Sequence, residues 1–409
     1  MKYLAVLGRQ PEISIAELEA QFPNSKFSLD GSCRTFFSPT SLKLSGGLPP
    51  GPSPVHVDRF GGVLKFAVEL TESPIEYLAG LPDGKITIGV SDYSKGASKK
   101  TASQEALKLK KILVRHGRSV RVVENKEAVL STATSLYNGL SGKNERKVEL
   151  IKLNDEWYRV IGVQDIDAYA KRDQARPARD AKVGMLPPKL AQVLINLCGP
   201  LKPGSVVLDP FCGTGVVLQE ALLMGYHAYG TDISERMVEY TERNLKWLLK
   251  FGKCSIREDT ERGSASTSAG RPWRRAGQTR LENEHFQISV GDAISFKWQQ
   301  PVTAVACEGY LGKPFSKIPT DMELKEQKQE CGAIATGFLK NLAQQIKKDT
   351  PVVIAVPAWL RPNGSYERLD ILDEISDMGY NVNNKTREGL LYHRDNQVVA
   401  RDILILRKK

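Results

Sequence analysis

The second half of the chain alternates apolar segments with helix-like segments, and this alternation constrains the fold more than any other feature. Strands are predicted over 205–209, 228–231, 286–290, 303–306 and 351–356, and helices over 216–224 and 235–251. Residues 390–392 and 398–406 predict a closing β-hairpin. Repeated strand-then-helix order is typical of a parallel, doubly wound sheet, so residues 189–409 are expected to form a Rossmann-like α/β domain.

Two smaller units precede this domain. Residues 1–82 predict a ferredoxin-like α+β domain, with strands over 3–7, 33–37 and 60–70 and a helix after Pro11. Residues 83–168 predict a second α/β unit, with a helix over 102–114 between strands. The charged, proline-bearing stretch 169–188 predicts an extended linker. Residues 258–283, rich in Ser, Gly, Ala and Arg, predict a mobile loop.

Positive charge is concentrated in the middle of the chain. Residues 81–185 hold 21 basic and 13 acidic side chains, a net charge of +8 out of +11 for all 409 residues. Such a region is typical of a module that binds a polyanion, because neutralising phosphates supplies affinity without sequence reading. A lysine-rich face that is simply solvated remains an alternative.

Other features limit the class of protein. The longest nearly unbroken apolar stretch, Val352–Leu360, contains a proline and is far shorter than the roughly 20 residues of a spanning helix. No cleavable leader is expected at the start, and the six cysteines show no paired spacing for zinc or for a disulfide framework. The histidines show no metal spacing either. We therefore expect a cytoplasmic protein with reduced thiols, no bound metal and no membrane segment.

The segment VVLDPFCGTG, Val206–Gly215, carries the strongest chemical signal. It places an acidic residue at a strand end and two glycines at the start of a helix, where the backbone can approach a ligand closely. It departs from GxGxxG, and no lysine follows to make a GxxxxGK loop. Dinucleotide and nucleoside triphosphate ligands are therefore less favoured than another nucleotide-like ligand.

Acidic residues also end the next two predicted strands. Asp232 stands 23 positions after Asp209, where a carboxylate can accept both ribose hydroxyls of an adenosine. Asp292, in the GDA segment after the third strand, is placed to accept an adenine amino group. A single such residue is more often a turn or cap residue. Three at successive strand ends predict a ligand crevice.

DPFCGTG at 209–215 closely resembles the first motif of S-adenosylmethionine-dependent amino methyltransferases, and GMLPPKLAQVLINL resembles the motif before it. More narrowly, LGRQPEISIAELEA, the basic middle unit and RDQARPARDAKVGMLPPKLA resemble the THUMP-domain tRNA guanine-N2 methyltransferases that act on guanosine ten of tRNA. The resemblance covers nearly the whole chain apart from the arginine-rich loop.

The resemblance implies a class I methyltransferase domain over 189–409, a THUMP RNA-binding domain over 83–168, S-adenosylmethionine as cofactor and tRNA as partner. Some relatives also use a small activator subunit. The cofactor-binding residues that it implies are Pro188, Asp209, Phe211, Gly213, Thr214, Gly215, Asp232, Ile233, Asp292 and Ala293. Of these, Asp232 would hold the ribose, and Asp292 with Ala293 the adenine.

The chain departs from the family at the fourth strand, where such enzymes usually carry Asp-Pro-Pro-Tyr and this sequence has Cys307-Glu308-Gly309-Tyr310. By the resemblance these four residues are the predicted catalytic group. The amine's lone pair is delocalised into the base, so a carboxylate and a carbonyl are needed to accept its hydrogens. Cys307 is a poor acceptor, whereas Glu308 carries a carboxylate one position later. Gly309 leaves a flexible carbonyl, and Tyr310 offers a face to stack a flipped base. The alternative is that Glu308 is a surface or capping residue.

With this resemblance we expect contact with RNA phosphates from five cations of the middle unit, namely Lys95, Lys99, Lys100, Arg115 and Arg118. The sequence as a whole predicts methylation of the N2 amine of a tRNA guanosine. Two alternatives stay open: a DNA amino methyltransferase, and a non-catalytic tRNA-binding protein that retains the cofactor site.

Overall fold

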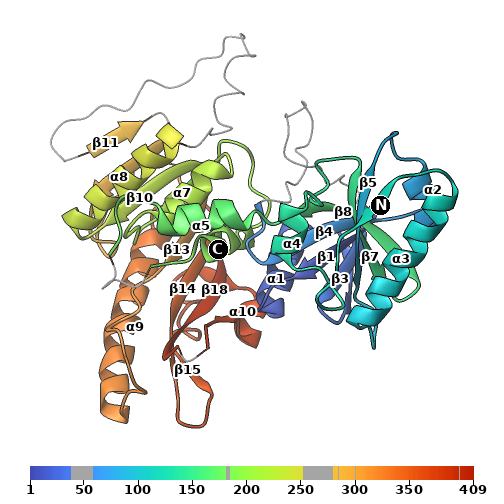
Figure 1. Ribbon diagram of the computed structural model, residues 1–409. Helices are drawn as coiled ribbons and strands as arrows, with labels where there is room; N and C mark the ends of the chain where they lie inside the picture. The colour runs from blue at the N-terminus through green and yellow to red at the C-terminus, as the bar shows by residue number, and fades with distance from the viewer. Residues whose placement is uncertain (38–58, 181–184, 252–279, 284, 300, 396) are drawn as a thin grey trace. The chain divides into compact units, whose positions relative to one another are not determined.

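The computed structural model describes residues 1–37, 59–180, 185–251, 280–283, 285–299, 301–395 and 397–409. These residues form two compact units, Met1–Ala170 and Lys171–Lys409 (Figure 1). Most of the loop predicted at 258–283 lies outside the described residues, and its last four, Arg280–Asn283, form strand β11.

The first unit is built on one eight-stranded sheet with the strand order β2-β3-β1-β4-β8-β7-β5-β6. Its strands are β1 (Lys2–Leu7), β2 (Lys26–Asp30), β3 (Cys33–Phe37), β4 (Val63–Glu69), β5 (Ile86–Asp92), β6 (Val120–Val122), β7 (Lys147–Leu153) and β8 (Glu156–Val163). Its helices are α1 (Pro11–Gln21), α2 (Pro74–Ala79), α3 (Lys99–Arg115) and α4 (Thr132–Tyr137), and α5 (Ile166–Gln174) runs on into the second unit.

The segments 1–82 and 83–168 share this sheet, because β4 of the first segment pairs antiparallel with β8 of the second. A buried ion pair joins them as well. Lys65 on β4 donates to Glu149 on β7 at 2.6 Å, and both side chains are almost completely buried. The backbone ladder and this pair make the two segments parts of one compact unit.

The second unit is built on a ten-stranded sheet. Its main order is β11-β12-β10-β9-β13-β14-β18-β16, and β15 and β17 pair with β14 and β18. Its strands are β9 (Val206–Asp209), β10 (His227–Asp232), β11 (Arg280–Asn283), β12 (Phe286–Val290), β13 (Ala304–Glu308), β14 (Pro351–Leu360), β15 (Tyr366–Arg368), β16 (Tyr380–Val382), β17 (Leu391–Tyr392) and β18 (Val399–Lys408). Its helices are α6 (Pro188–Leu197), α7 (Val216–Leu223), α8 (Glu235–Phe251), α9 (Asp321–Ala343) and α10 (Asn384–Glu388).

Strand order in this sheet reverses between β9 and β13. The chain runs outward from β9 to β10 and β12 in one direction, then returns to β13 beside β9 and continues to β14 in the other. All of these neighbours are parallel, so their carboxyl ends meet at one edge. Right-handed crossovers in opposite directions put helices on both faces of the sheet. The predicted doubly wound α/β fold is therefore confirmed, and its ligand crevice is expected at this switch point.

A cluster of aromatic side chains packs beside that edge of the sheet. Phe338 on α9 is fully buried, and its ring makes edge contacts with Phe211 and Trp298 at centroid distances of 5.2 and 6.3 Å. Trp298 Nε1 also donates to Thr231 Oγ1 at 3.3 Å, at the end of β10. The long helix α9, drawn in orange in Figure 1, packs against β14. Helix α9 thereby holds the loops that follow β9 and β12 in place.

Local structure follows the predicted elements closely, with one clear difference. The strand at Phe286–Val290, the helix at Glu235–Phe251 and the terminal hairpin of β17 with β18 are confirmed. The segment predicted as an extended linker instead begins inside helix α5. One of its charges is held within the fold, because Arg172 donates to the buried carboxylate of Glu220 at 2.6 Å. None of the described helices combines the length and the apolar composition that a membrane-spanning helix needs.

Candidate functional site

Three carboxylates and a glycine loop meet at the carboxyl edge of the second sheet. Asp209 is the last residue of β9, Asp232 of β10 and Glu308 of β13. These strands are neighbours in the order β10-β9-β13, on both sides of the switch point. Two of the three acids that the sequence placed at strand ends, Asp209 and Asp232, therefore lie at one edge together with Glu308 of the fourth-strand motif.

The loop after β9 is shaped by its glycines. Gly213 and Gly215 have φ values of +51° and +78°, a region that other residues rarely adopt. A Cβ on Gly215 would also lie only 2.9 Å from the side chain of Thr241. Asp209 Oδ1 accepts the amide of Phe211 at 3.2 Å, which turns the chain directly after the strand. These positions therefore need glycine to let the loop enter α7.

Helix α8 clamps this loop through two polar side chains that the sequence reading did not single out. Thr241 Oγ1 donates to the carbonyl of Gly213 at 2.8 Å, and Asn244 Nδ2 donates to the carbonyl of Thr214 at 2.9 Å. Both residues are fully buried on a helix that otherwise packs apolar side chains. The available sequence signal was that these two polar residues share one helical face with the apolar Leu245 and Leu248.

Asp232 connects the loop to the second strand. Its Oδ2 accepts the amide of Gly213 and its Oδ1 accepts the amide of Ser234, both at 2.9 Å. Each carboxylate oxygen has a further lone pair, so these bonds fix the carboxylate and still leave acceptor capacity for a ligand hydroxyl. Ile233, which follows Asp232, is 71% exposed.

Electrostatics distinguish these carboxylates from ordinary surface acids. Burial raises the pKa of Asp209 well above its usual range, and the charges of Asp232 and Glu308 raise it further, against a hydrogen bond from the Phe211 amide. Burial also raises the pKa of Asp232. Among the described residues no cationic side chain pairs with either one. A buried acid such as Asp209, or a half-buried one such as Asp232, is stabilised in its charged form by a cation, and acids with perturbed pKa values mark candidate functional sites.

The loop after β12 adds the third predicted position. Asp292 is exposed, and its Oδ1 accepts the amide of Ile294 at 3.0 Å. Ala293 is buried, and its carbonyl accepts from Asn341 of α9 at 3.0 Å. Ile294 is 41% exposed. Large apolar side chains are therefore exposed beside the ends of both β10 and β12, which suits a flat, partly apolar ligand.

The structure supplies a partner for Glu308 that the sequence reading missed. Arg401 on β18 donates from Nε to Glu308 Oε1, and the two side chains are 6% and 15% exposed. Burial raises the pKa of Glu308, and the charge of Arg401 opposes that rise. An arginine within the apolar strand Val399–Lys408 was the signal that could have pointed to it.

The other residues of the fourth-strand motif separate in space. Cys307 is fully buried in the core, and burial raises the pKa of its thiol well above the usual range. Its side chain has no access to a ligand, so the place in the catalytic group predicted for it has no geometric support. Gly309 donates its amide to Ala355, and Tyr310 is 38% exposed with its hydroxyl donating to Glu330 at 3.2 Å. Pro188, the first residue of α6, is buried.

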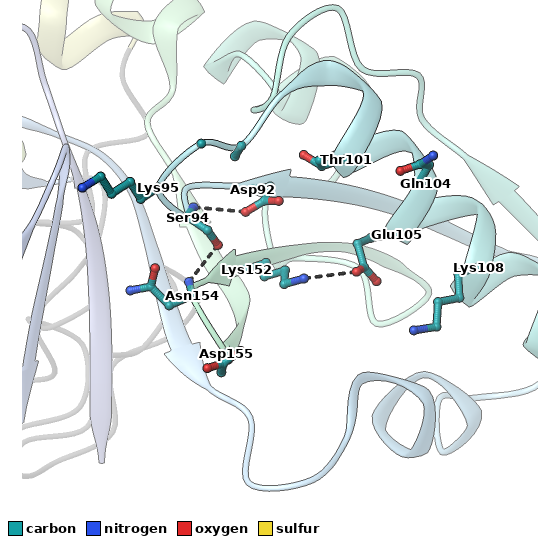
Figure 2. A pocket seen from close by; sticks show the side chains of 12 residues that line it. Asp92, Ser94, Lys95, Thr101, Gln104, Glu105, Lys108, Lys152, Asn154 and Asp155 are labelled. Carbon is teal, nitrogen blue, oxygen red and sulfur yellow. Dashed lines mark hydrogen bonds and ion pairs between the residues drawn. The ribbon is translucent and has the colours of Figure 1, made fainter.

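The cations predicted for RNA contact lie in the first unit, around helix α3. Lys95, Lys99, Lys100 and Arg115 are exposed. Lys95 lines a hollow of about 510 Å³ between the start of α3 and the turn from β7 to β8 (Figure 2). Lys108 and Asn154 line the same hollow. Arg115 ends the 17-residue helix, so it is roughly 24 Å from Lys99.

Arg118 differs from the other four. Its guanidinium donates to Asp83 at 3.2 Å and to the carbonyls of Leu81 and Pro82 at 2.9 and 2.8 Å. These bonds anchor the turn before β5, and the contact of Arg118 with RNA stays a prediction. The described residues contain no cluster of three or more His, Cys, Asp or Glu side chains placed to hold a metal.

Residues 98–243 match the sequence profile of a family described as DNA methylase. A tRNA (guanine(10)-N2)-dimethyltransferase of Methanothermobacter thermautotrophicus is 50% identical over 76 residues, which are 18% of this chain and 22% of the relative. An enzyme with the same name from Methanocaldococcus jannaschii is 32% identical over 130 residues, 31% of this chain and 36% of the relative. The chain thus matches about a fifth to a third of the length of these curated relatives.

Among solved structures, TrmN from Thermus thermophilus aligns over the full length of both chains, with 16% identity and a TM-score of 0.45.

Proposed function

We propose that this protein transfers a methyl group from S-adenosylmethionine to the exocyclic N2 amine of a guanosine in tRNA, at position ten. The observation that supports it most is the convergence of the glycine loop, Asp232 and Glu308 at the switch point of a doubly wound sheet. The relatives with 50% and 32% identity carry the name of this activity.

The site fits a cationic, nucleoside-bearing cofactor. Asp209 and Asp232 are acids without a described counter-ion, which suits the positive sulfonium of S-adenosylmethionine. Bound there, the cofactor supplies an electrophilic methyl group. Asp232 would hold the ribose hydroxyls, and Ile233, Asp292 and Ala293 the adenine. Phe211, Gly213, Thr214 and Gly215 with Asp209 would surround the methionine end, and Pro188 would stand beside it.

Glu308 would prepare the substrate amine. Its carboxylate accepts a hydrogen of the N2 amine and draws the lone pair out of the ring, toward the methyl group. The Gly309 carbonyl is proposed as the second acceptor and the exposed ring of Tyr310 as the stacking face for the flipped guanine. Transfer is then direct, and the rate gain comes from orientation in a pocket that excludes water.

The first unit would hold the tRNA. We propose a ferredoxin-like part over 1–82 and a THUMP part over 83–168, joined through the shared sheet. Lys95, Lys99, Lys100 and Arg115 would contact phosphates. The proposal places the enzyme in the cytoplasm with tRNA, and an activator subunit is a further partner to test.

A DNA amino methyltransferase is the second candidate, favoured by the match of residues 98–243 to a family described as DNA methylase. Both candidates use the same loop and the same kind of amine chemistry. They differ in the polymer that the first unit must bind.

Incubation with methyl-labelled S-adenosylmethionine and either bulk tRNA or duplex DNA, followed by mass spectrometry of the released nucleosides, tests the proposal. We expect labelled N2-methylguanosine from tRNA and no label in DNA. Labelled N6-methyladenine or N4-methylcytosine from DNA would establish the second candidate. No transfer into either polymer, with and without candidate activator subunits, would leave a tRNA-binding protein.

A further inference from the structure

Resting on the proposed function, we propose that Arg401 is a positioning residue for the transfer reaction, which holds one oxygen of Glu308 so that the other oxygen meets the substrate amine. Neither the sequence motif nor the comparisons point to Arg401. It lies 93 positions after Glu308, on the antiparallel strand β18.

The sheet register brings the two residues to the same face. Glu308 on β13 is opposite Ala355 on β14, and Arg401 on β18 is opposite Pro357. Ala355 and Pro357 are two positions apart on one strand, so their side chains, and those of their partners, point to one face. The strand between Glu308 and Arg401 thus presents only the small Ala355 and the compact Pro357 there. The long arginine side chain can therefore reach across it.

The contact divides the carboxylate of Glu308 between two tasks. Oε1 accepts Arg401 Nε, and Oε2 has no partner among the described residues. The side chain remains 15% exposed at the end of β13, beside Asp209. One oxygen is fixed within the protein, and the other is free to accept a hydrogen from the guanine amine.

Arg401 also keeps Glu308 in the charged form that accepts a hydrogen. The pKa of Glu308 responds to burial, which raises it, and to the charge and hydrogen bond of Arg401, which lower it. Asp209 on the neighbouring strand is the acid that opposes Arg401, because Asp209 and Glu308 repel each other. Burial raises the pKa of Asp209 on β9 and of the Cys307 thiol on β13, and the charge of Glu308 adds to both shifts. Among the described residues, Arg401 is therefore the cation that keeps Glu308 ionised beside another acid.

The first measurement needs neither cofactor nor RNA. Side-chain carbon-13 NMR of protein labelled at glutamate follows the ionisation of Glu308, and the spectrum of Glu308→Gln assigns its resonance. We expect Arg401→Met to move the titration midpoint upward by roughly one to three pH units, and Arg401→Lys to move it less because lysine keeps the charge. An unmoved midpoint in Arg401→Met overturns the electrostatic part of the inference.

The second measurement is the pH profile of single-turnover transfer. In Arg401→Met the acid limb of the profile should shift to higher pH by the same amount as the NMR midpoint. The rate should fall about tenfold for each pH unit by which the midpoint exceeds the assay pH. Arg401→Lys should recover part of that loss. Methionine is similar in size to the arginine stem, so a purely packing role would let Met perform at least as well as Lys.

A matched pair on the opposite face of β18 controls for the loss of a buried ion pair. Arg368 Nε donates to the buried Asp402 at 2.5 Å, one position from Arg401. Arg368→Met should lower stability comparably and leave the acid limb where it is. If Arg368→Met moved the acid limb as far as Arg401→Met does, the effect would come from losing any buried ion pair of β18, and the inference would be wrong.

The two measurements separate the inference from the function beneath it. If the parent protein transfers methyl groups and the acid limb of the pH profile is unchanged in Arg401→Met, only the role of Arg401 is overturned. A parent that transfers no methyl group would overturn the proposed function and this role together, whatever the NMR titration shows.

Discussion

The two units each bury an ion pair at a strand, and the pairs differ in whether anything can reach the acid. In the first unit Lys65 donates to Glu149, Ser135 and the carbonyl of Leu130, and the side chains of Lys65 and Glu149 are 2% and 0% exposed. Glu149 Oε2 has no hydrogen-bond partner among the described residues, yet it is sealed from solvent. Glu308 in the second unit also keeps an oxygen without a described partner, but its side chain is 15% exposed. Exposure of the carboxylate to solvent, more than an oxygen without a partner, therefore distinguishes an acid that a substrate can reach.

The largest effect should come from breaking the sealed pair. Lys65→Met leaves the charge of Glu149 buried without a counter-ion, and we expect the free energy of unfolding to fall by about 3–5 kcal/mol. Urea unfolding followed by circular dichroism measures it. The double variant Lys65→Met with Glu149→Leu should recover much of the loss, because it removes both charges. A loss below about 1 kcal/mol in the single variant would mean that the pair is solvated.

The accessible acid should affect the reaction more than the fold. Glu308→Gln keeps an acceptor oxygen and loses the charge, whereas Glu308→Ala loses both, so the single-turnover rate should fall in the order parent, Gln, Ala. The losses are expected to be roughly tenfold to a thousandfold, with cofactor and tRNA affinities little changed. Glu149→Gln serves as the control, since its acid is sealed. Parent-like turnover in Glu308→Ala would exclude the role.

A smaller effect is expected at the cofactor. Asp232→Ala removes charge-assisted bonds to ribose and should weaken S-adenosylmethionine binding by roughly 1–3 kcal/mol in calorimetry. Asp232 also accepts the amides of Gly213 and Ser234, so thermal unfolding must show that the variant is folded. Unchanged affinity in a folded variant would remove the ribose role.

Most of the fold and part of the site follow from the sequence. Strand ends were predictable because apolar runs stop at Asp209, Asp232 and the GDA segment, and parallel strands must present those ends at one edge. The Glu308–Arg401 contact was not, since it depends on the order β13-β14-β18 and on small residues between them. The buried state of Cys307 follows from the same register, which turns neighbouring residues to opposite faces.

The smallest effect per residue is expected in the first unit, and it tests whether exposed charge there means RNA contact. Lys95, Lys99 and Lys100 are exposed near the start of α3, and the described partner of Lys99 is Glu124 at 3.9 Å, with both side chains mostly exposed. Replacing the three lysines by Gln should weaken tRNA binding and lower its salt slope by about 0.9 for each phosphate that is no longer neutralised. The measurement is the tRNA dissociation constant over a series of salt concentrations.

Arg118→Met is the matched control for these lysines, because Arg118 already donates to Asp83, Leu81 and Pro82. This variant should lower stability and change the salt slope less than the triple variant does. Equal salt slopes in the triple variant and the parent would identify the three lysines as a solvated face. A fall in the slope as large in Arg118→Met as in the triple variant would move the RNA surface toward the far end of α3, where Arg115 is exposed.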